Sequence, residues 1–125
     1  MLGENARPAI ADLERMLGDE LPQTCVVAAE ALVKLVPGHH ALNVLIELYE
    51  SHPVVKVRLH AIEALTHVGA AAAPVVERMR IATINTNDEY LLGAGIYAVL
   101  VLKGLYKPGI ATVGDAGVAL LRTLA

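Results

Sequence analysis

The sequence predicts an all-α protein, a solenoid of about three antiparallel helical hairpins followed by a short C-terminal capping helix. Three observations lead to this prediction. Apolar residues recur at helical spacing along most of the 125-residue chain. Glycine, proline, asparagine and aspartate residues interrupt that spacing at short intervals. Similar segments also return about 33 residues apart, and a period of that length is typical of stacked helical hairpins.

Six segments have the spacing of helices, and the residues between them supply starts and stops. The predicted helices cover roughly residues 6–17, 22–35, 40–50, 53–68, 72–84 and 88–103. First turns are expected at Pro8, Pro22, Pro53 and Pro74, because a missing N–H costs nothing there. Asn87 or Asp88 is expected to cap the sixth helix. The pattern then breaks at residues 107–109, and a short last helix is expected from Asp115.

The hairpins also look like copies of one another. "AAEALVKL" from Ala28 matches "AIEALTHV" from Ala61, an offset of 61 − 28 = 33, and "GIYAVLVL" from Gly95 follows at 95 − 61 = 34. "ARPAIADL" from Ala6 matches "AAPVVERM" from Ala72, an offset of 66, which is twice 33. We therefore expect a single domain over residues 1–125. Its predicted parts are repeats at about 6–36, 39–69 and 71–104 and a C-terminal cap at 107–125.

The central copy resembles a HEAT repeat. In "VVKVRLHAIEALTHVGAAAAPVVERM", Val57-Arg58 opens the second helix, alanines suit tight contacts, and Pro74 starts the next first helix. The resemblance covers residues 6 to about 104. It implies a right-handed α-solenoid in which the second helices line a concave surface. The other copies have Thr24-Cys25 and Leu91-Leu92 at the Val-Arg position, so a role for the repeat arginine is implied only at Arg58.

A narrower resemblance involves "HPVVKVRLHAIEALTHVG" and "NDEYLLGAGIYAVLVLKGLYKP". These segments are similar to the HEAT-like C-terminal extensions of some bacterial sulfatases. That resemblance implies an accessory part of a hydrolase that supplies packing or oligomerisation. The chain has no C-x-P-S-R-like segment, so no sulfatase chemistry transfers to it.

Composition narrows the classes of function. Ten basic and thirteen acidic residues give a net charge of −3, which argues against a nucleic-acid-binding protein. Cys25 is the only cysteine, so an intrachain disulfide or a zinc–thiolate cluster is excluded, and a buried, inert thiol is expected. The longest uncharged apolar run, residues 91–102, is shorter than the roughly twenty residues that span a bilayer. Without a recognisable secretory signal, we expect a cytoplasmic protein with no membrane partner, although a fragment of an exported enzyme would look the same.

The predicted helix at 53–68 has one polar strip between two apolar ones. Successive helical residues are about 100° apart. The partner helix of the hairpin is expected to cover one apolar strip, Val54, Val57, Ala61, Ala64, Leu65 and Val68. Neighbouring repeats are expected to cover the other, Val55, Leu59 and Ile62. The remaining strip is Lys56, His60, Glu63 and His67. The repeat offsets carry it to Gln23, Val27, Glu30 and Lys34 in the first copy and to Tyr90, Ala94, Tyr97 and Val101 in the third. Glu30, Glu63 and Tyr97 would then form one row of the concave surface, and Lys34, His67 and Val101 another.

Two imidazoles and a carboxylate on one strip raise the possibility of a metal site. His60 and His67 are seven residues apart, roughly 10 Å along a helix, and the H-E-x-x-H spacing of helical zinc sites is absent. Lys34 in the neighbouring row would repel a cation. A solvated strip is therefore the favoured interpretation, with a pH-sensitive partner contact and metal binding as alternatives.

The favoured function is a non-catalytic protein-interaction module without a cofactor. Serine occurs once, at Ser51 in a hairpin turn, and no nucleophile with a positioned base is apparent. The partner-binding residues we predict are Glu30, Lys34, Lys56, His60, Glu63, His67, Tyr90 and Tyr97. Tyrosine is common at the energetic centres of interfaces, but the C-terminal segment could instead cover Tyr90 and Tyr97. The alternatives are an accessory part of a sulfatase-like hydrolase and a small metal-binding helical protein. The apolar third repeat also leaves open a homodimer.

Overall fold

The computed structural model describes residues 3–124, and their side chains from Arg7 onward. Within this range the chain forms seven α-helices, one 3-10 helix and no strand, so the all-α prediction is confirmed. The elements are α1 (Gly3–Met16), α2 (Pro22–Leu35), α3 (Ala41–Ser51), α4 (Val55–His67), η1 (Gly69–Val75), α5 (Val76–Ile84), α6 (Glu89–Leu102) and α7 (Gly114–Thr123).

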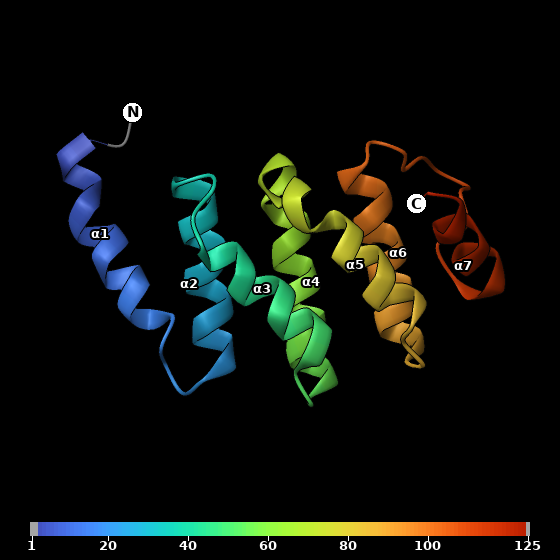
Figure 1. The fold of residues 1–125 in the computed structure, drawn as a ribbon, viewed down its shortest axis with the longest axis horizontal. Helices are drawn as coiled ribbons and strands as arrows, with labels where there is room; N and C mark the ends of the chain where they lie inside the picture. The colour runs from blue at the N-terminus through green and yellow to red at the C-terminus, as the bar shows by residue number, and fades with distance from the viewer. Residues whose placement is uncertain (1–2, 125) are drawn as a thin grey trace.

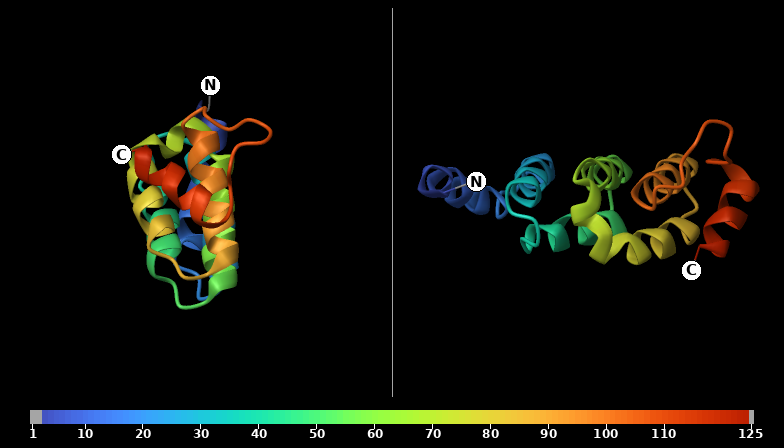
Figure 2. Two further views of the ribbon diagram at one scale, coloured as in Figure 1. Left: turned by 90° about the vertical axis from the view of Figure 1, so that its right-hand side faces the viewer. Right: turned by 90° about the horizontal axis from the view of Figure 1, so that it is seen from above.

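Helices α1 to α6 stand side by side along the long axis of the molecule and run alternately up and down (Figure 1). Seen from above, they form two layers (Figure 2). One layer contains α2, α4 and α6, and the other contains α3 and the η1–α5 segment. At one end α1 packs against α2, and at the other end α7 packs against α6 and α5. Each helix between α2 and α6 therefore has neighbours on several sides.

Local sequence signals account for several helix ends. Pro22 is the first residue of α2, where its fixed φ suits the helix and its missing N–H is not needed. Asp88 caps α6, because its Oδ1 accepts a 2.9 Å hydrogen bond from the Leu91 N–H, which decides between the two expected caps. Gly38 and Gly69 have φ values of +92° and +62° in the turns after α2 and α4, a conformation that glycine adopts without a steric penalty.

Other expected boundaries are wrong in detail. The predicted helix at 72–84 is divided into η1, which contains Pro74, and α5. Pro74 has no backbone N–H to donate within a continuous helix, and Val75, with φ −114° and ψ 1°, separates the two segments. Pro8 lies inside α1 instead of in its first turn. Pro53 precedes α4, whose N-cap is Val54. Because it lies outside the helix, Val54 is 51 % exposed and does not face the partner helix as expected.

The core is one apolar cluster that includes residues from α2 to α7. The α2, α4 and α6 helices begin at residues 22, 55 and 89, at intervals of 55 − 22 = 33 and 89 − 55 = 34. Buried positions recur at the same intervals. Equivalent buried sets are Ala28, Ala61 and Gly95, then Ala29, Ile62 and Ile96, then Leu32, Leu65 and Val99. The three helices therefore bury corresponding sides.

A small polar cluster lies within this core. The Tyr49 hydroxyl donates to Thr83 Oγ1 at 2.5 Å, and Thr83 Oγ1 donates to the Met79 carbonyl at 2.7 Å. A Cβ on Gly95 would clash with the side chains of Thr83 and Tyr49. Glycine at position 95 therefore permits the close approach of α6 to α3 and α5. Burial raises the pKa of the Tyr49 phenol, while the Thr83 hydrogen bond and the charge of Arg58 oppose the increase.

The C-terminal segment covers the apolar end of the third hairpin. Gly117 of α7 lies against Ile96 of α6, and Leu121 is fully buried. The Arg80 guanidinium donates to the Leu121 carbonyl at 3.1 Å and makes two hydrogen bonds to the Glu77 carboxylate. Helix α7 is thus attached by both apolar packing and a buried polar contact.

No single helix within residues 3–124 is both long and apolar enough to cross a membrane. Only the pair Val55–His67 and Gly69–Ile84, bent by 118°, meets such a requirement of length and composition.

Candidate interaction face

The eight sequence-predicted binding residues all lie on α2, α4 and α6, the helices of one layer. We call their common surface the α2–α4–α6 face. It is defined by Gln23, Val27, Glu30 and Lys34 on α2, Lys56, His60, Glu63 and His67 on α4, and Tyr90, Ala94, Tyr97 and Val101 on α6. All of these side chains are exposed or half-buried. The other sides of the same helices bury the core residues described above.

A groove of about 270 Å³ lies between α4 and α6. It is lined by Ile62, Glu63, Thr66, His67, Ala94 and Tyr97. The Thr66 hydroxyl donates to the Ile62 carbonyl at 2.8 Å, so the hydroxyl proton already has an acceptor within α4. The groove thus combines apolar surface with one carboxylate, one imidazole and one phenol ring.

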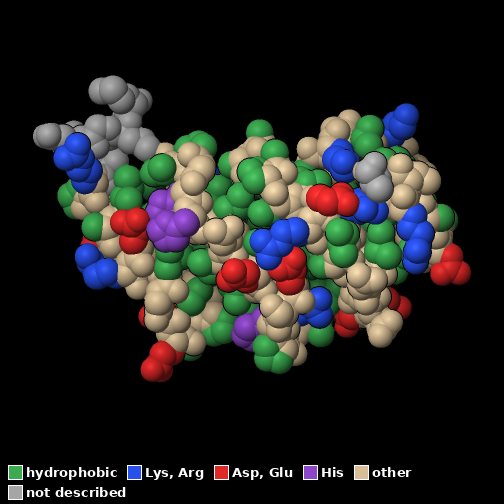
Figure 3. All heavy atoms as spheres, in the orientation of Figure 1, with side chains coloured by type: hydrophobic (Ala, Val, Ile, Leu, Met, Phe, Trp, Pro, Cys, Tyr) green, Lys and Arg blue, Asp and Glu red, His purple; other side chains and the backbone are tan. Residues whose placement is uncertain are grey.

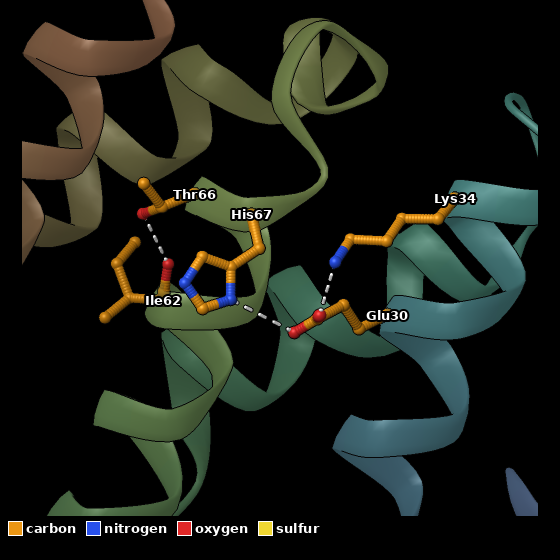
Figure 4. A network of polar contacts seen from close by, with 5 residues as sticks. All are labelled: Glu30, Lys34, Ile62, Thr66 and His67. Atoms are coloured by element: carbon orange, nitrogen blue, oxygen red, sulfur yellow. Dashed lines mark hydrogen bonds and ion pairs between the residues drawn. The ribbon is translucent and has the colours of Figure 1, made fainter.

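Glu30 connects α2 to α4 beside this groove (Figure 4). Its Oε2 is 2.8 Å from Lys34 Nζ, and its Oε1 is 3.5 Å from His67 Nδ1. The expected rows placed Glu30 beside Glu63 and Lys34 beside His67. The Glu30 carboxylate instead lies next to His67, one helical turn further along α4, because the packing of the two helices sets their relative register.

A second groove, of about 350 Å³, lies between the starts of α2 and α4. It is lined by Gln23, Val54, Lys56, Val57 and His60. The polar strip of α4 is therefore split, with Lys56 and His60 in one groove and Glu63 and His67 in the other.

The tyrosines of α6 remain accessible. Tyr90 is 71 % exposed and Tyr97 is 44 % exposed. Tyr106, in the segment after α6, packs edge-on against Tyr97 with ring centroids 4.9 Å apart. The C-terminal segment therefore touches Tyr97 without burying either ring. Sequence reasoning missed Tyr106, because a repeat offset places only residues within helices.

Some side chains could in principle bind a metal ion or act as nucleophiles. Among the side chains that the structure describes, from Arg7 to Leu124, no three from His, Cys, Asp or Glu are close enough to hold one metal ion. The Cys25 thiol contacts the Asp19 carbonyl at 3.1 Å, and its pKa is raised mainly by burial and also by the charge of Asp19. The Ser51 hydroxyl donates to the Glu47 carbonyl at 2.9 Å. Both potential nucleophiles thus make contacts with backbone carbonyls.

A larger cleft, of about 600 Å³, lies beside the end of α3 and the turn between α5 and α6. It is lined by Glu50, Arg58, Ile81, Ala82 and the 85–88 turn. Its charged groups already have structural partners. Both Glu50 oxygens accept hydrogen bonds from Arg78, Arg58 Nε donates to the Tyr49 carbonyl at 2.7 Å, and Asp88 caps α6.

The opposite layer has a different surface. Figure 3 shows the α3 and α5 side, where acidic and basic side chains lie next to one another among apolar ones. The Arg78–Glu50 pair joins α5 to α3 on this layer. Charged side chains on this layer therefore connect helices. The two grooves lined by tyrosine and histidine lie on the α2–α4–α6 face.

No protein-family model, curated protein or solved structure matches this chain. The HEAT and sulfatase-extension resemblances therefore remain predictions from the residues quoted above.

Proposed function

We propose that this chain is a HEAT-like, right-handed α-solenoid that acts as a non-catalytic interaction module and binds a protein partner on the α2–α4–α6 face. One observation carries the proposal. The helices α2, α4 and α6 bury corresponding sides and leave exposed, on one common face, tyrosine, histidine and charged residues around two grooves.

The arrangement of the helices supports the solenoid part of the proposal. The α2, α4 and α6 helices start at intervals of 33 and 34 residues and lie in one layer (Figure 2). Helix α7 packs on α5 and α6 at one end. Arrays of helical hairpins depend on contacts between neighbouring repeats and need their last apolar surface covered, and α7 supplies such a cover.

The accessible aromatic rings support partner binding. Tyrosine buries a large, rigid area at low entropic cost and retains a hydroxyl for a hydrogen bond. Tyr97 lines the α4–α6 groove, and Tyr90 lies seven residues earlier on the same helix. Residues seven apart lie on the same side of a helix. A partner crossing α6 could therefore contact both rings.

The contacts of Cys25 and Ser51 favour a non-catalytic role. A reactive cysteine needs a lowered pKa, whereas burial raises the pKa of Cys25. A catalytic serine needs a base that accepts its proton, whereas Ser51 donates to the backbone of its own helix. These two observations support a binding function of the α2–α4–α6 face over catalysis by Cys25 or Ser51.

Self-association through the third hairpin stays a prediction. Exposed apolar side chains after α6 include Leu105, Tyr106 and Val113. Light scattering on the purified chain should show a mass near 26 kDa for a dimer, twice the 13.2 kDa of one chain.

Site-specific photo-crosslinking tests the proposed face. A photoreactive phenylalanine analogue is placed at Tyr90 or Tyr97 in cells that make the protein, and at Glu47 as a control. Glu47 is exposed on α3 in the opposite layer. We expect both tyrosine positions to crosslink the same protein, and the control position to give no such product.

A Tyr97→Ala substitution, introduced into the Tyr90-labelled protein, should reduce this product severalfold without loss of the folded state. Crosslinking only from Glu47, or none from either tyrosine position, would contradict the proposed face. A large loss of stability in Tyr97→Ala would show that the ring is part of the core.

A further inference from the structure

We infer that the groove between α4 and α6 binds the cationic side chain of an exposed lysine or arginine in a protein partner. This inference rests on the proposed function, since it names the kind of partner that the α2–α4–α6 face would recognise. It depends on an uncompensated carboxylate, an oriented imidazole and an aromatic wall that meet in one small groove.

The carboxylate is Glu63. The α2–α4–α6 face contains two glutamates, and their surroundings differ. Glu30 is paired on one oxygen with Lys34 and lies 3.5 Å from His67 on the other. Glu63 is exposed and makes no ion pair or side-chain hydrogen bond with any residue that the structure describes. A charged group from a partner could therefore pair with Glu63 without displacing an existing contact.

His67 adds a hydrogen-bond acceptor. In the neutral form of the His67 ring, a proton on Nδ1 points to the nearby Glu30 carboxylate and leaves Nε2 as the acceptor. Figure 4 shows this second nitrogen on the side of the ring away from Glu30, towards Ile62 and Thr66. Both of these residues line the groove. The imidazole is thus oriented to accept a hydrogen bond from a donor in the groove.

Tyr97 forms the aromatic wall. Its edge-on contact with Tyr106 restrains the ring and leaves it 44 % exposed. A lysine ammonium or an arginine guanidinium is attracted to the face of such a ring. Ile62 and Ala94 supply apolar surface for the methylene groups of the same side chain.

Size and charge favour one long basic side chain over other occupants. At about 270 Å³ the groove is smaller than most sites for small molecules, which begin near roughly 300 Å³. Lys56 is seven residues from Glu63, about 10 Å along the helix, and lines the other groove. Lys34 is paired with Glu30. The net charge of −3 also favours encounter with a basic segment.

A titration of the ¹⁵N-labelled full chain with short peptides tests the inference. At pH 7.5 the probes are acetyl-Ala-Arg-Ala-amide and the same peptide with citrulline, which keeps the shape of arginine and removes its charge. We expect the arginine peptide to shift the backbone amide signals of Glu63, His67 and Tyr97, and to bind about tenfold more tightly than the citrulline peptide.

Two variants locate the effect. Glu63→Gln should weaken arginine-peptide binding about tenfold, because it removes the charge and retains the size of the side chain. Glu47→Gln, on the opposite layer, should leave binding unchanged. The amide spectra of both variants report directly whether each remains folded.

Equal binding of the two peptides, or retention of arginine-peptide binding in Glu63→Gln, would overturn the inference. Shifts confined to residues outside the groove, or no shift at all, would also overturn it. None of these results would contradict the proposed function if the crosslinks at Tyr90 and Tyr97 are observed. Loss of those crosslinks would instead remove the proposed function itself.

Discussion

Tyr49 and Tyr97 are the same residue type on neighbouring helical hairpins, and their surroundings differ completely. Tyr49 is fully buried, and its hydroxyl donates to Thr83. Tyr97 is 44 % exposed and touches another tyrosine. A buried hydroxyl without a hydrogen-bond partner is costly, so the core site requires Thr83 beside the ring and glycine at position 95. The exposed site has no such requirement, which leaves the Tyr97 ring available to a partner.

The largest difference is expected from truncation of the two rings. Tyr49→Ala should lower the free energy of unfolding by about 4 kcal/mol, because it opens a cavity and leaves Thr83 without its donor. Tyr97→Ala should change it by less than about 1 kcal/mol, since it loses mainly the edge-on contact with Tyr106. Urea unfolding followed by circular dichroism measures both values. Similar losses for the two variants would remove the distinction between a core and a surface tyrosine.

A smaller effect should distinguish two glycines of α6. Gly95→Ala should destabilise the protein by about 2 kcal/mol, because the new methyl group would clash with Thr83 and Tyr49. At Gly93 an added Cβ would meet only ordinary contacts, at 3.8 Å. Gly93→Ala should therefore stabilise the protein by up to about 1 kcal/mol through helix propensity. Thermal unfolding of the two variants makes the comparison, and destabilisation by Gly93→Ala equal to that by Gly95→Ala would contradict it.

The smallest effect concerns the Tyr49 hydroxyl and alkaline pH. Tyr49→Phe should cost about 1 kcal/mol near neutrality, the net value of one hydrogen bond. Burial raises the pKa of Tyr49 in the folded state. Above a pH of about 10, the unfolded chain loses this proton while the folded chain retains it. The contribution of the Tyr49 phenol to the free energy of unfolding should therefore be fully present below that pH and decrease as the pH rises above it.

Unfolding measurements at several pH values compare the wild type with Tyr49→Phe. The loss of stability at alkaline pH should be smaller in Tyr49→Phe than in the wild type. It should also be smaller than in a Tyr90→Phe control, because Tyr90 is 71 % exposed. If Tyr49→Phe and the wild type lose stability equally as the pH rises, the raised pKa of Tyr49 does not contribute to the pH dependence of stability.

Much of the fold follows from local sequence. The periodic apolar positions predict the six main helical segments within a few residues, and Pro22 and Asp88 identify two of the starts. The accessibility of Glu63 and Tyr97 also agrees with the polar strip read from the sequence. These features are predictable because burial and capping depend on residues within one or two turns of the same helix.

Contacts between elements were decided only by the tertiary structure. Glu30 lies next to His67 because the packing of α2 on α4 sets their register, which depends on side-chain volumes along the whole contact. Tyr106 reaches Tyr97 from a segment that has no helical periodicity. The contact of Gly95 with Tyr49 and Thr83 joins three helices. The sequence by itself determined which side of each helix is polar. Packing decided which polar and aromatic groups meet, because that depends on distances between residues far apart in the chain.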